Sequence, residues 1–159
     1  MANRFFISME DGLDSPEWIS KIEPYMLQIA EETGFDGEEV SVLFCCDDFI
    51  RNLNKQYREI DSATDVLSFE DGTEYTDEDG ESWVSAGDII VSLDTLPKNA
   101  EYFGVSQNEE LKRLLLHGFL HLNGFDHGDE HVESGKEPEC EMLLLQEKTL
   151  KKFAEYKIL

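Results

Sequence analysis

This sequence of 159 residues has no long hydrophobic stretch and no even number of cysteines that could all pair in disulfides. A membrane-spanning helix needs roughly 18 or more apolar residues in a row, and no stretch approaches that length. Three cysteines are an odd number in no zinc-finger spacing, so neither a disulfide framework nor a thiolate metal cage is expected. The first residues also lack the apolar segment of a secretory signal. We therefore expect a cytoplasmic protein with no membrane partner.

Basic residues are scarce, with 13 Lys and Arg against 36 Asp and Glu and a formal net charge of −23. Affinity for nucleic acid depends on Lys and Arg that neutralise phosphates, so the composition argues against a broad nucleic-acid surface. A local basic groove is still compatible with an acidic remainder, because net charge describes only the long-range field. Two explanations stay open: an acidic, salt-tolerant surface, or weak intrinsic affinity for RNA with recruitment by a partner.

Histidine is rare as well, yet three of the four histidines fall within eleven residues, at His117, His121 and His127. The preceding residues predict a helix, because Ser106 and Glu109 have capping-box spacing. Apolar residues then recur at steps of three and four, which places one stripe of the helix against a core. On such a helix His117 and His121 lie on one face, one turn apart.

Gly124 stands where this helix is expected to end, since glycine adopts the left-handed conformation without a steric penalty. The chain can then turn back and bring His127 to the other two histidines. Three neutral imidazoles without a fourth protein ligand are typical of a catalytic zinc site, in which the open position holds water. The sequence therefore predicts one zinc ion, or another divalent transition metal, on His117, His121 and His127.

The same histidine spacing occurs in metzincin proteases, which place a glutamate directly after the first histidine as the general base. Here that position is Gly118, which cannot take a proton. The ligand pattern is kept, but the residue that defines peptide hydrolysis by this mechanism is missing.

Periodicity and turn residues predict an α+β fold in a single domain spanning residues 1–159. A mixed sheet of about four strands should carry helices on one or both faces. Between residues 70 and 81 seven of twelve residues are acidic, which we interpret as a solvated loop or disordered lid. Strands are expected at 4–9, 40–46, 65–69 and 86–92, and helices at 15–34, 47–57, 93–103, 106–124 and from 138 onward.

Three blocks of sequence carry a family resemblance: Asn54-Lys-Gln-Tyr-Arg58 with Thr64-Asp-Val-Leu-Ser-Phe69, then Gly87-Asp-Ile89, then His117-Gly-Phe-Leu-His-Leu-Asn-Gly-Phe-Asp-His127. Together they resemble the YbeY family of bacterial metal-dependent endoribonucleases, also called rRNA maturation factors. The resemblance implies a zincin-like metal helix and a single-strand endoribonuclease. It also implies action in small-subunit rRNA maturation and ribosome quality control, with the small subunit and assembly factors as partners and no DNA. Departures from the usual family residues fall at Glu59, Ala63, Glu70, Ala86, Asn123 and Phe125.

Arg58 is the candidate for a second catalytic element beside His117. From spacing alone, a helix-end arginine that neutralises carbonyl groups is favoured. The resemblance reverses this, because the functionally important arginine of the family falls in this Tyr-Arg pair. The attacking group stays open between water activated at the metal and the 2′-OH of RNA.

Two other functions stay open. One is a metalloprotease-like hydrolase, and the other is a non-catalytic ribosome-assembly factor with a stabilising metal. Asp126 is interpreted either as a group that orients an imidazole or as a turn residue. Asp65 and Asp88 are expected to fix strand ends, and His131 to be a surface histidine.

Overall fold

A computed structural model of the chain describes residues 3–126 and 140–159. A four-stranded sheet forms the centre of the molecule, with strand order β1-β2-β4-β3. The first three of these run parallel, and β3 pairs antiparallel with β4 at one edge. The mixed four-stranded sheet predicted from the sequence is therefore confirmed. The strands are β1 (Arg4–Met9), β2 (Glu38–Cys45), β3 (Val66–Thr76) and β4 (Ser82–Ser92).

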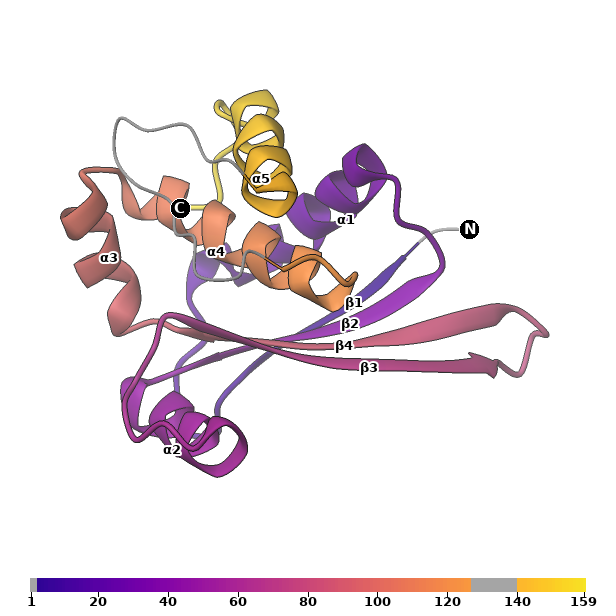
Figure 1. Cartoon of the computed structure of the whole chain (residues 1–159), viewed down its shortest axis with the longest axis horizontal. Coiled ribbons are helices and arrows are strands. Elements are labelled where there is room, and N and C mark those ends of the chain that lie inside the picture. Colours follow the sequence, from indigo (N-terminus) through magenta and orange to yellow (C-terminus); the bar gives the residue numbers. More distant parts are fainter. Residues whose placement is uncertain (1–2, 127–139) are drawn as a thin grey trace.

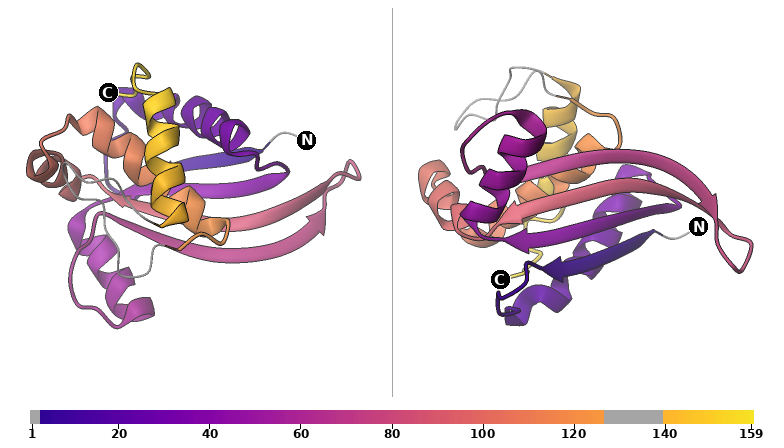
Figure 2. Two further views of the ribbon diagram at one scale, coloured as in Figure 1. Left: turned by 45° about the horizontal axis from the view of Figure 1, so that its top comes forward. Right: turned by 90° about the horizontal axis from the view of Figure 1, so that it is seen from below.

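Helices cover the two faces of the sheet unequally. One face carries α1, α4 and α5, whereas α2 lies on the opposite face (Figures 1 and 2). None of the described helices is long and apolar enough to cross a membrane. The helical segments are a 3₁₀ helix (Glu17–Lys21), α1 (Ile22–Thr33), α2 (Asp47–Arg58), α3 (Thr95–Phe103), α4 (Gln107–Leu122) and α5 (Glu141–Lys152).

Alternation along β2 divides the apolar side chains between two layers, as the period of two in a strand requires. Val42 and Phe44 are fully buried in the main core beneath α1, α4 and α5. Cys45 faces the other way and packs with Ile50 of α2 in a second, smaller cluster. The central helix α4 has ten buried residues, so the predicted metal helix is held in the core along most of its length.

The first helix begins later than residue 15, where the sequence pattern placed it. Residues Glu17–Lys21 form a 3₁₀ helix, and α1 begins only at Ile22. Pro24 explains the difference, because proline has no N–H to donate and is tolerated only in the first turn of an α-helix. A continuous helix from residue 15 would have placed Pro24 in its interior, at a cost of about 3 kcal/mol.

The acidic stretch from 70 to 81 is not the loop that we expected. β3 continues to Thr76 and β4 starts at Ser82, so most of the stretch is a two-stranded hairpin that extends beyond the other strands (Figure 1). Asp77 closes the turn by accepting hydrogen bonds from the backbone N–H groups of Asp79 and Glu81. It also accepts one from Trp83 Nε1 at 2.9 Å. The acidic composition suggested a loop, but it did not reveal the hydrogen bonds by which Asp77 forms this turn.

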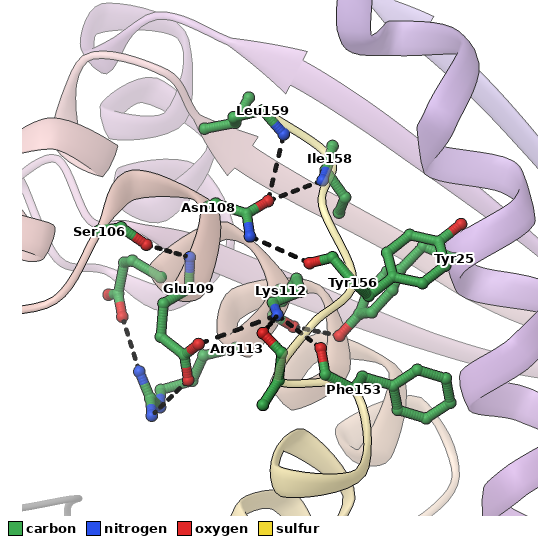
Figure 3. A network of polar contacts seen from close by, with 12 residues as sticks. Tyr25, Ser106, Asn108, Glu109, Lys112, Arg113, Phe153, Tyr156, Ile158 and Leu159 are labelled. Carbon is green, nitrogen blue, oxygen red and sulfur yellow. Dashed lines mark hydrogen bonds and ion pairs between the residues drawn. The ribbon is translucent and has the colours of Figure 1, made fainter.

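The N-terminal half of α4 is tied to the C-terminal end of the chain by polar contacts (Figure 3). Lys112, whose side chain is fully buried, donates from Nζ to the backbone carbonyl of Phe153 at 2.7 Å. Asn108 Oδ1 accepts from the backbone N–H of Ile158 at 2.7 Å. Ser106 Oγ accepts from Glu109 N, which confirms the predicted N-cap. These contacts fix the helix that carries the histidines.

Candidate active site

His117 and His121 lie one turn apart near the end of α4, with their rings edge to face and the centroids 4.6 Å apart. Their Nε2 atoms converge to 3.1 Å. The helix ends at Leu122, and Gly124 follows with φ of 85°, the left-handed conformation expected there. The predicted helical pairing of these two histidines is present in the fold.

The other ring nitrogen of each histidine faces a carbonyl oxygen. His117 Nδ1 lies 2.8 Å from Oε1 of Gln146, and His121 Nδ1 lies 3.0 Å from the backbone oxygen of Phe125. A carbonyl oxygen only accepts hydrogen bonds, so each Nδ1 carries the proton and donates. Both Nε2 atoms are therefore lone-pair donors aimed at the same place.

Two lone pairs at 3.1 Å repel each other unless a cation or a shared proton lies between them. On a tetrahedral zinc ion with Zn–N distances of about 2.0–2.1 Å, two nitrogens are roughly 3.3 Å apart. The donor set of His117 and His121 therefore fits a zinc-like ion. The predicted third ligand, His127, lies outside the described residues. Within 3–126 and 140–159, no group of three or more His, Cys, Asp and Glu could hold a metal.

Gly118, the position of the glutamate base in metzincins, faces the sheet. A Cβ added there would lie 2.8 Å from Cγ2 of Ile89 and 3.3 Å from Oγ of Ser68. The first distance is too short for any side chain unless Ile89 or the backbone around it shifts. Close packing against the sheet therefore disfavours a larger residue at this position, including the glutamate that acts as general base in the protease mechanism.

Arg58 is the last residue of α2, and its guanidinium reaches β3. Nη2 donates to the backbone carbonyl of Ser68 at 2.7 Å, and Ser68 Oγ donates to the carbonyl of Gly118 at 3.3 Å. The arginine thus reaches the histidine helix through a single strand residue. Three sequence blocks that resemble the family meet at this point of the fold.

Aromatic rings border Arg58 on the exposed side. The Cζ atom of Arg58 lies 5.6 Å from the ring centroid of Phe69. Tyr57 packs edge to face on the same ring with the centroids 5.4 Å apart. Tyr57 is 60% exposed, so its ring presents accessible surface beside the cation.

Close packing of the backbone explains why the Gly87-Asp88-Ile89 block begins with a glycine. Its φ is +138°, and an added Cβ would lie only 2.0 Å from the backbone oxygen of Phe69. Any other residue would push β3 away from β4. This close approach holds the part of β3 that contacts Arg58 and α4.

The two strand aspartates differ in their surroundings. Asp65 accepts a hydrogen bond from the backbone N–H of Val66 at 2.7 Å and another from Asn99 Nδ2 at 2.8 Å. It therefore fixes the start of β3 to α3, as expected. Asp88 lies on β4, where partial desolvation of its carboxyl group, followed by the nearby charge of Asp71, raises the pKa of that group.

Gln146 is the site residue that sequence reasoning missed. It lies on α5, which the expected order of elements included only as a packing helix. One signal was available, because Gln146 stands between Met142 and Leu150 at i, i+4 spacing on an otherwise apolar stripe. A buried polar residue on such a stripe needs a hydrogen-bond partner, and His117 supplies it.

Comparison with known proteins agrees with this arrangement. The sequence model of one family, described as Endoribonuclease YbeY, matches residues 7–154. An Endoribonuclease YbeY from Treponema denticola is 48% identical over 158 residues, which cover 99% of this chain and 98% of that protein. One from Aquifex aeolicus is 39% identical over 125 residues, or 79% of this chain and 80% of the relative.

The fold is also similar to a solved structure. The solution structure of a protein from Thermotoga maritima matches 96% of this chain and 91% of its own, with a TM-score of 0.61 and 28% identity. The match to the family model and the two relatives confirm the resemblance that the three sequence blocks indicated. The chain therefore belongs to the endoribonuclease YbeY family.

Proposed function

We propose that this protein is a metal-dependent endoribonuclease that cleaves single-stranded RNA during maturation and quality control of small-subunit ribosomal RNA. Family membership supports the endoribonuclease activity and RNA as the substrate. The observation that carries the metal dependence is the pair of Nε2 lone pairs of His117 and His121, which converge to 3.1 Å. We propose zinc, or another divalent transition metal, on these two residues and His127.

The chemistry divides between the ion and the side chains around it. When bound, a divalent ion lowers the pKa of water and polarises a phosphoryl oxygen. His117 and His121 would supply the Nε2 atoms that bind the ion. A carbonyl oxygen at each Nδ1 orients the ring. Arg58 binds the scissile phosphate, because only one of its N–H groups has a described hydrogen bond and the planar fork suits a phosphate.

Single-stranded RNA is proposed as the substrate because of the aromatic edge beside Arg58. Proteins that bind single strands combine positive charge with exposed aromatic rings on which bases stack. Tyr57 supplies an exposed ring next to the guanidinium. In a duplex the bases are paired and stacked, so they could not reach such a ring.

Recruitment by ribosomal partners would compensate for the weak RNA affinity that the negative net charge implies. With a net charge of −23 the protein repels RNA at long range, so affinity for free RNA should be weak. We propose that the small subunit and its assembly factors bring protein and RNA together, which implies a cytoplasmic location. A non-catalytic assembly factor is the remaining alternative, whereas the fit at Gly118 argues against a protease.

A cleavage assay tests the proposal. One labelled RNA sequence is presented as a single strand and as a duplex, to protein that is untreated, treated with chelator, or treated and then supplied with zinc. We expect cleavage of the single strand only, loss of cleavage with chelator, and recovery with zinc. Metal analysis should give about one ion per chain, and His121→Ala should lose it.

His131→Ala provides the matched control, since His131 is the one histidine outside the predicted ligand set. It should keep both metal and cleavage. Cleavage that persists in the chelated protein would contradict metal dependence. Full metal content in His121→Ala would contradict the ligand set, and equal cleavage of the duplex would contradict the single-strand preference.

A further inference from the structure

Gln146 is 1% exposed and faces His117 from the neighbouring helix. Its Oε1 atom lies 2.8 Å from His117 Nδ1, which requires the imidazole proton to be on Nδ1. The lone pair of His117 is then on Nε2, the atom that faces His121. The amide of Gln146 therefore decides which nitrogen of His117 can bind a cation.

A charged neighbour fixes the orientation of this amide. Gln146 Nε2 donates to Oε2 of Glu147 at 3.0 Å. Glu147 in turn accepts two hydrogen bonds from Arg113, from Nε at 3.2 Å and from Nη2 at 2.9 Å. A bidentate arginine and carboxylate pair constrains geometry more strongly than a single contact does. The Glu147 carboxylate is thereby held in place. Because it only accepts hydrogen bonds, the NH₂ group of the Gln146 amide must face it.

These four residues close a loop between two helices. Arg113 and His117 lie one turn apart on α4, and Gln146 and Glu147 are adjacent on α5. The guanidinium orients a carboxylate, the carboxylate orients an amide, and the amide orients the imidazole. The imidazole of His117 is therefore oriented through the neutral amide of Gln146 rather than by a charged group.

The reversed amide would have the opposite effect. It would place the NH₂ group of Gln146 against His117 Nδ1, and the imidazole would then carry its proton on Nε2. A protonated Nε2 cannot bind a metal ion, and it would donate instead towards His121 Nε2. Reversal would also set Oε1 against the Glu147 carboxylate, leaving two acceptors facing each other. The Arg113 and Glu147 pair therefore selects against this state.

We propose that Gln146 is a positioning residue that holds His117 in its metal-binding tautomer, and that Arg113 and Glu147 act by fixing the Gln146 amide. The functional role of this orientation, which is metal binding, rests on the proposed metal site. Its first test needs no metal, because the tautomer is a property of the protein alone.

The tautomers are measured in metal-free protein by two-bond ¹H–¹⁵N NMR of the imidazole rings, above about pH 8, where a free imidazole is neutral. In the parental protein both His117 and His121 should carry the proton on Nδ1, and without a cation between them their two Nε2 atoms should lie further apart than 3.1 Å. Gln146→Leu should move His117 towards the Nε2–H form. His121 should not change, because its partner is the backbone oxygen of Phe125, so it serves as an internal control.

Zinc affinity gives the second readout, measured by competition with a chelating dye. Loss of a group that orients a metal-binding histidine typically weakens the affinity by about 10–100-fold. We expect that loss in Gln146→Leu. Glu147→Leu, which frees the amide while leaving Gln146 in place, should give a smaller loss. Lys148→Ala, an exposed residue on the same helix, is the matched control and should show no loss.

An unchanged His117 tautomer in Gln146→Leu would overturn the inference, as would unchanged zinc affinity in that variant. Failure of the parental protein to bind zinc would instead refute the proposed metal site, and the NMR result would still decide the role of Gln146. If Gln146→Leu does not fold, Glu147→Leu replaces it in both measurements. Parental behaviour in Glu147→Leu would then refute the role given to the charged pair.

Discussion

Arg58 Nη2 donates to the backbone carbonyl of Ser68 at 2.7 Å, so the last residue of α2 is fastened to β3 across the sheet edge. The same serine contacts the carbonyl of Gly118 through its hydroxyl. A charge at the end of a helix usually interacts with the carbonyl groups of that helix. Here the guanidinium contacts β3 instead, and Ser68 links that strand to the histidine helix, near which a scissile phosphate would lie in the proposed function.

Arg58→Ala should remove most RNA cleavage while metal content stays unchanged. Removing one donor that stabilises developing charge typically lowers the rate by roughly 10²–10³-fold. Arg58→Lys should restore only part of the rate, because an ammonium group lacks the planar fork. Cleavage rates and metal analysis on the same preparations measure both effects. An alanine variant that cleaves at the parental rate would show that Arg58 has only a structural role.

Tyr57→Ala should weaken the binding of single-stranded RNA by about 1–3 kcal/mol, the usual contribution of one stacked base. Tyr57→Phe keeps the ring and should bind as the parental protein does. The matched control is Tyr102→Ala, because Tyr102 is 83% exposed but lies on α3. Titration with several RNA sequences measures the effect, which should be similar for all of them. Equal losses in the two alanine variants would refute a stacking site at Tyr57.

Glu59→Gly should stabilise the fold. Glu59 ends α2 with φ of 60° and is the one non-glycine residue with positive φ among those described. A side chain in this conformation costs about 1 kcal/mol, and part of the gain is offset by the greater freedom of glycine in the unfolded chain. Denaturant unfolding should therefore show a gain of roughly 0.5 kcal/mol. Gln28→Gly, at an exposed position inside α1, should instead lose about 1 kcal/mol.

Glu110→Gln should change how stability depends on pH. Burial raises the pKa of Glu110 to about 7, although the charge of Arg113 opposes the shift. Oε1 of this buried residue has no hydrogen-bond partner in the described part of the chain. Because the folded state holds the proton more tightly than the unfolded state does, this group lowers the free energy of unfolding as pH rises from about 4.5 to 7.

The effect of Glu110→Gln should follow that window. At pH 5 the carboxyl is protonated in the folded protein, and the variant should match the parental stability. At pH 8 the variant should be more stable by up to about 3 kcal/mol, since each pKa unit corresponds to 1.36 kcal/mol. Denaturant titrations at the two pH values measure this difference. A constant difference between the proteins at both would contradict the raised pKa.

RNA is expected to approach along α2, where Arg51, Lys55 and Arg58 lie on one side of the helix at i, i+4 and i+7. Arg51 Nε also contacts Asp61 Oδ1 at 2.8 Å, so part of its charge is already paired. Replacing Arg51 and Lys55 together by alanine should weaken binding of many RNA sequences similarly. The salt dependence should become shallower by about one unit for each phosphate that the protein no longer neutralises.

The control for this pair is Lys148→Ala with Lys151→Ala, two exposed lysines on α5. Both double variants change the net charge equally, so a long-range effect would be the same in each. Binding titrations at several salt concentrations distinguish them. Identical affinities would show that the charged side of α2 is an ordinary solvated surface.

Local patterns in the sequence were enough for the features that depend on neighbouring residues. Ser106 and Gly124 marked the two ends of the histidine helix, because caps and left-handed turns are set by a few consecutive residues. The spacing of His117 and His121 then followed from the helical repeat. Where local chemistry was read incompletely the prediction was wrong, as at Pro24 in α1 and at the turn around Asp77.

By itself, the sequence determined that two histidines would share a helix face, that Arg58 would lie at the end of the helix expected at 47–57, and that the fold would be α+β. Only the tertiary structure decided what surrounds them. The partner of His117 is Gln146, 29 residues away, and the partner of Arg58 is a backbone carbonyl on β3. Gly118 packs against Ile89, which disfavours a glutamate there. Such contacts join residues far apart in the chain, and they depend on how sheet and helices pack rather than on any local pattern.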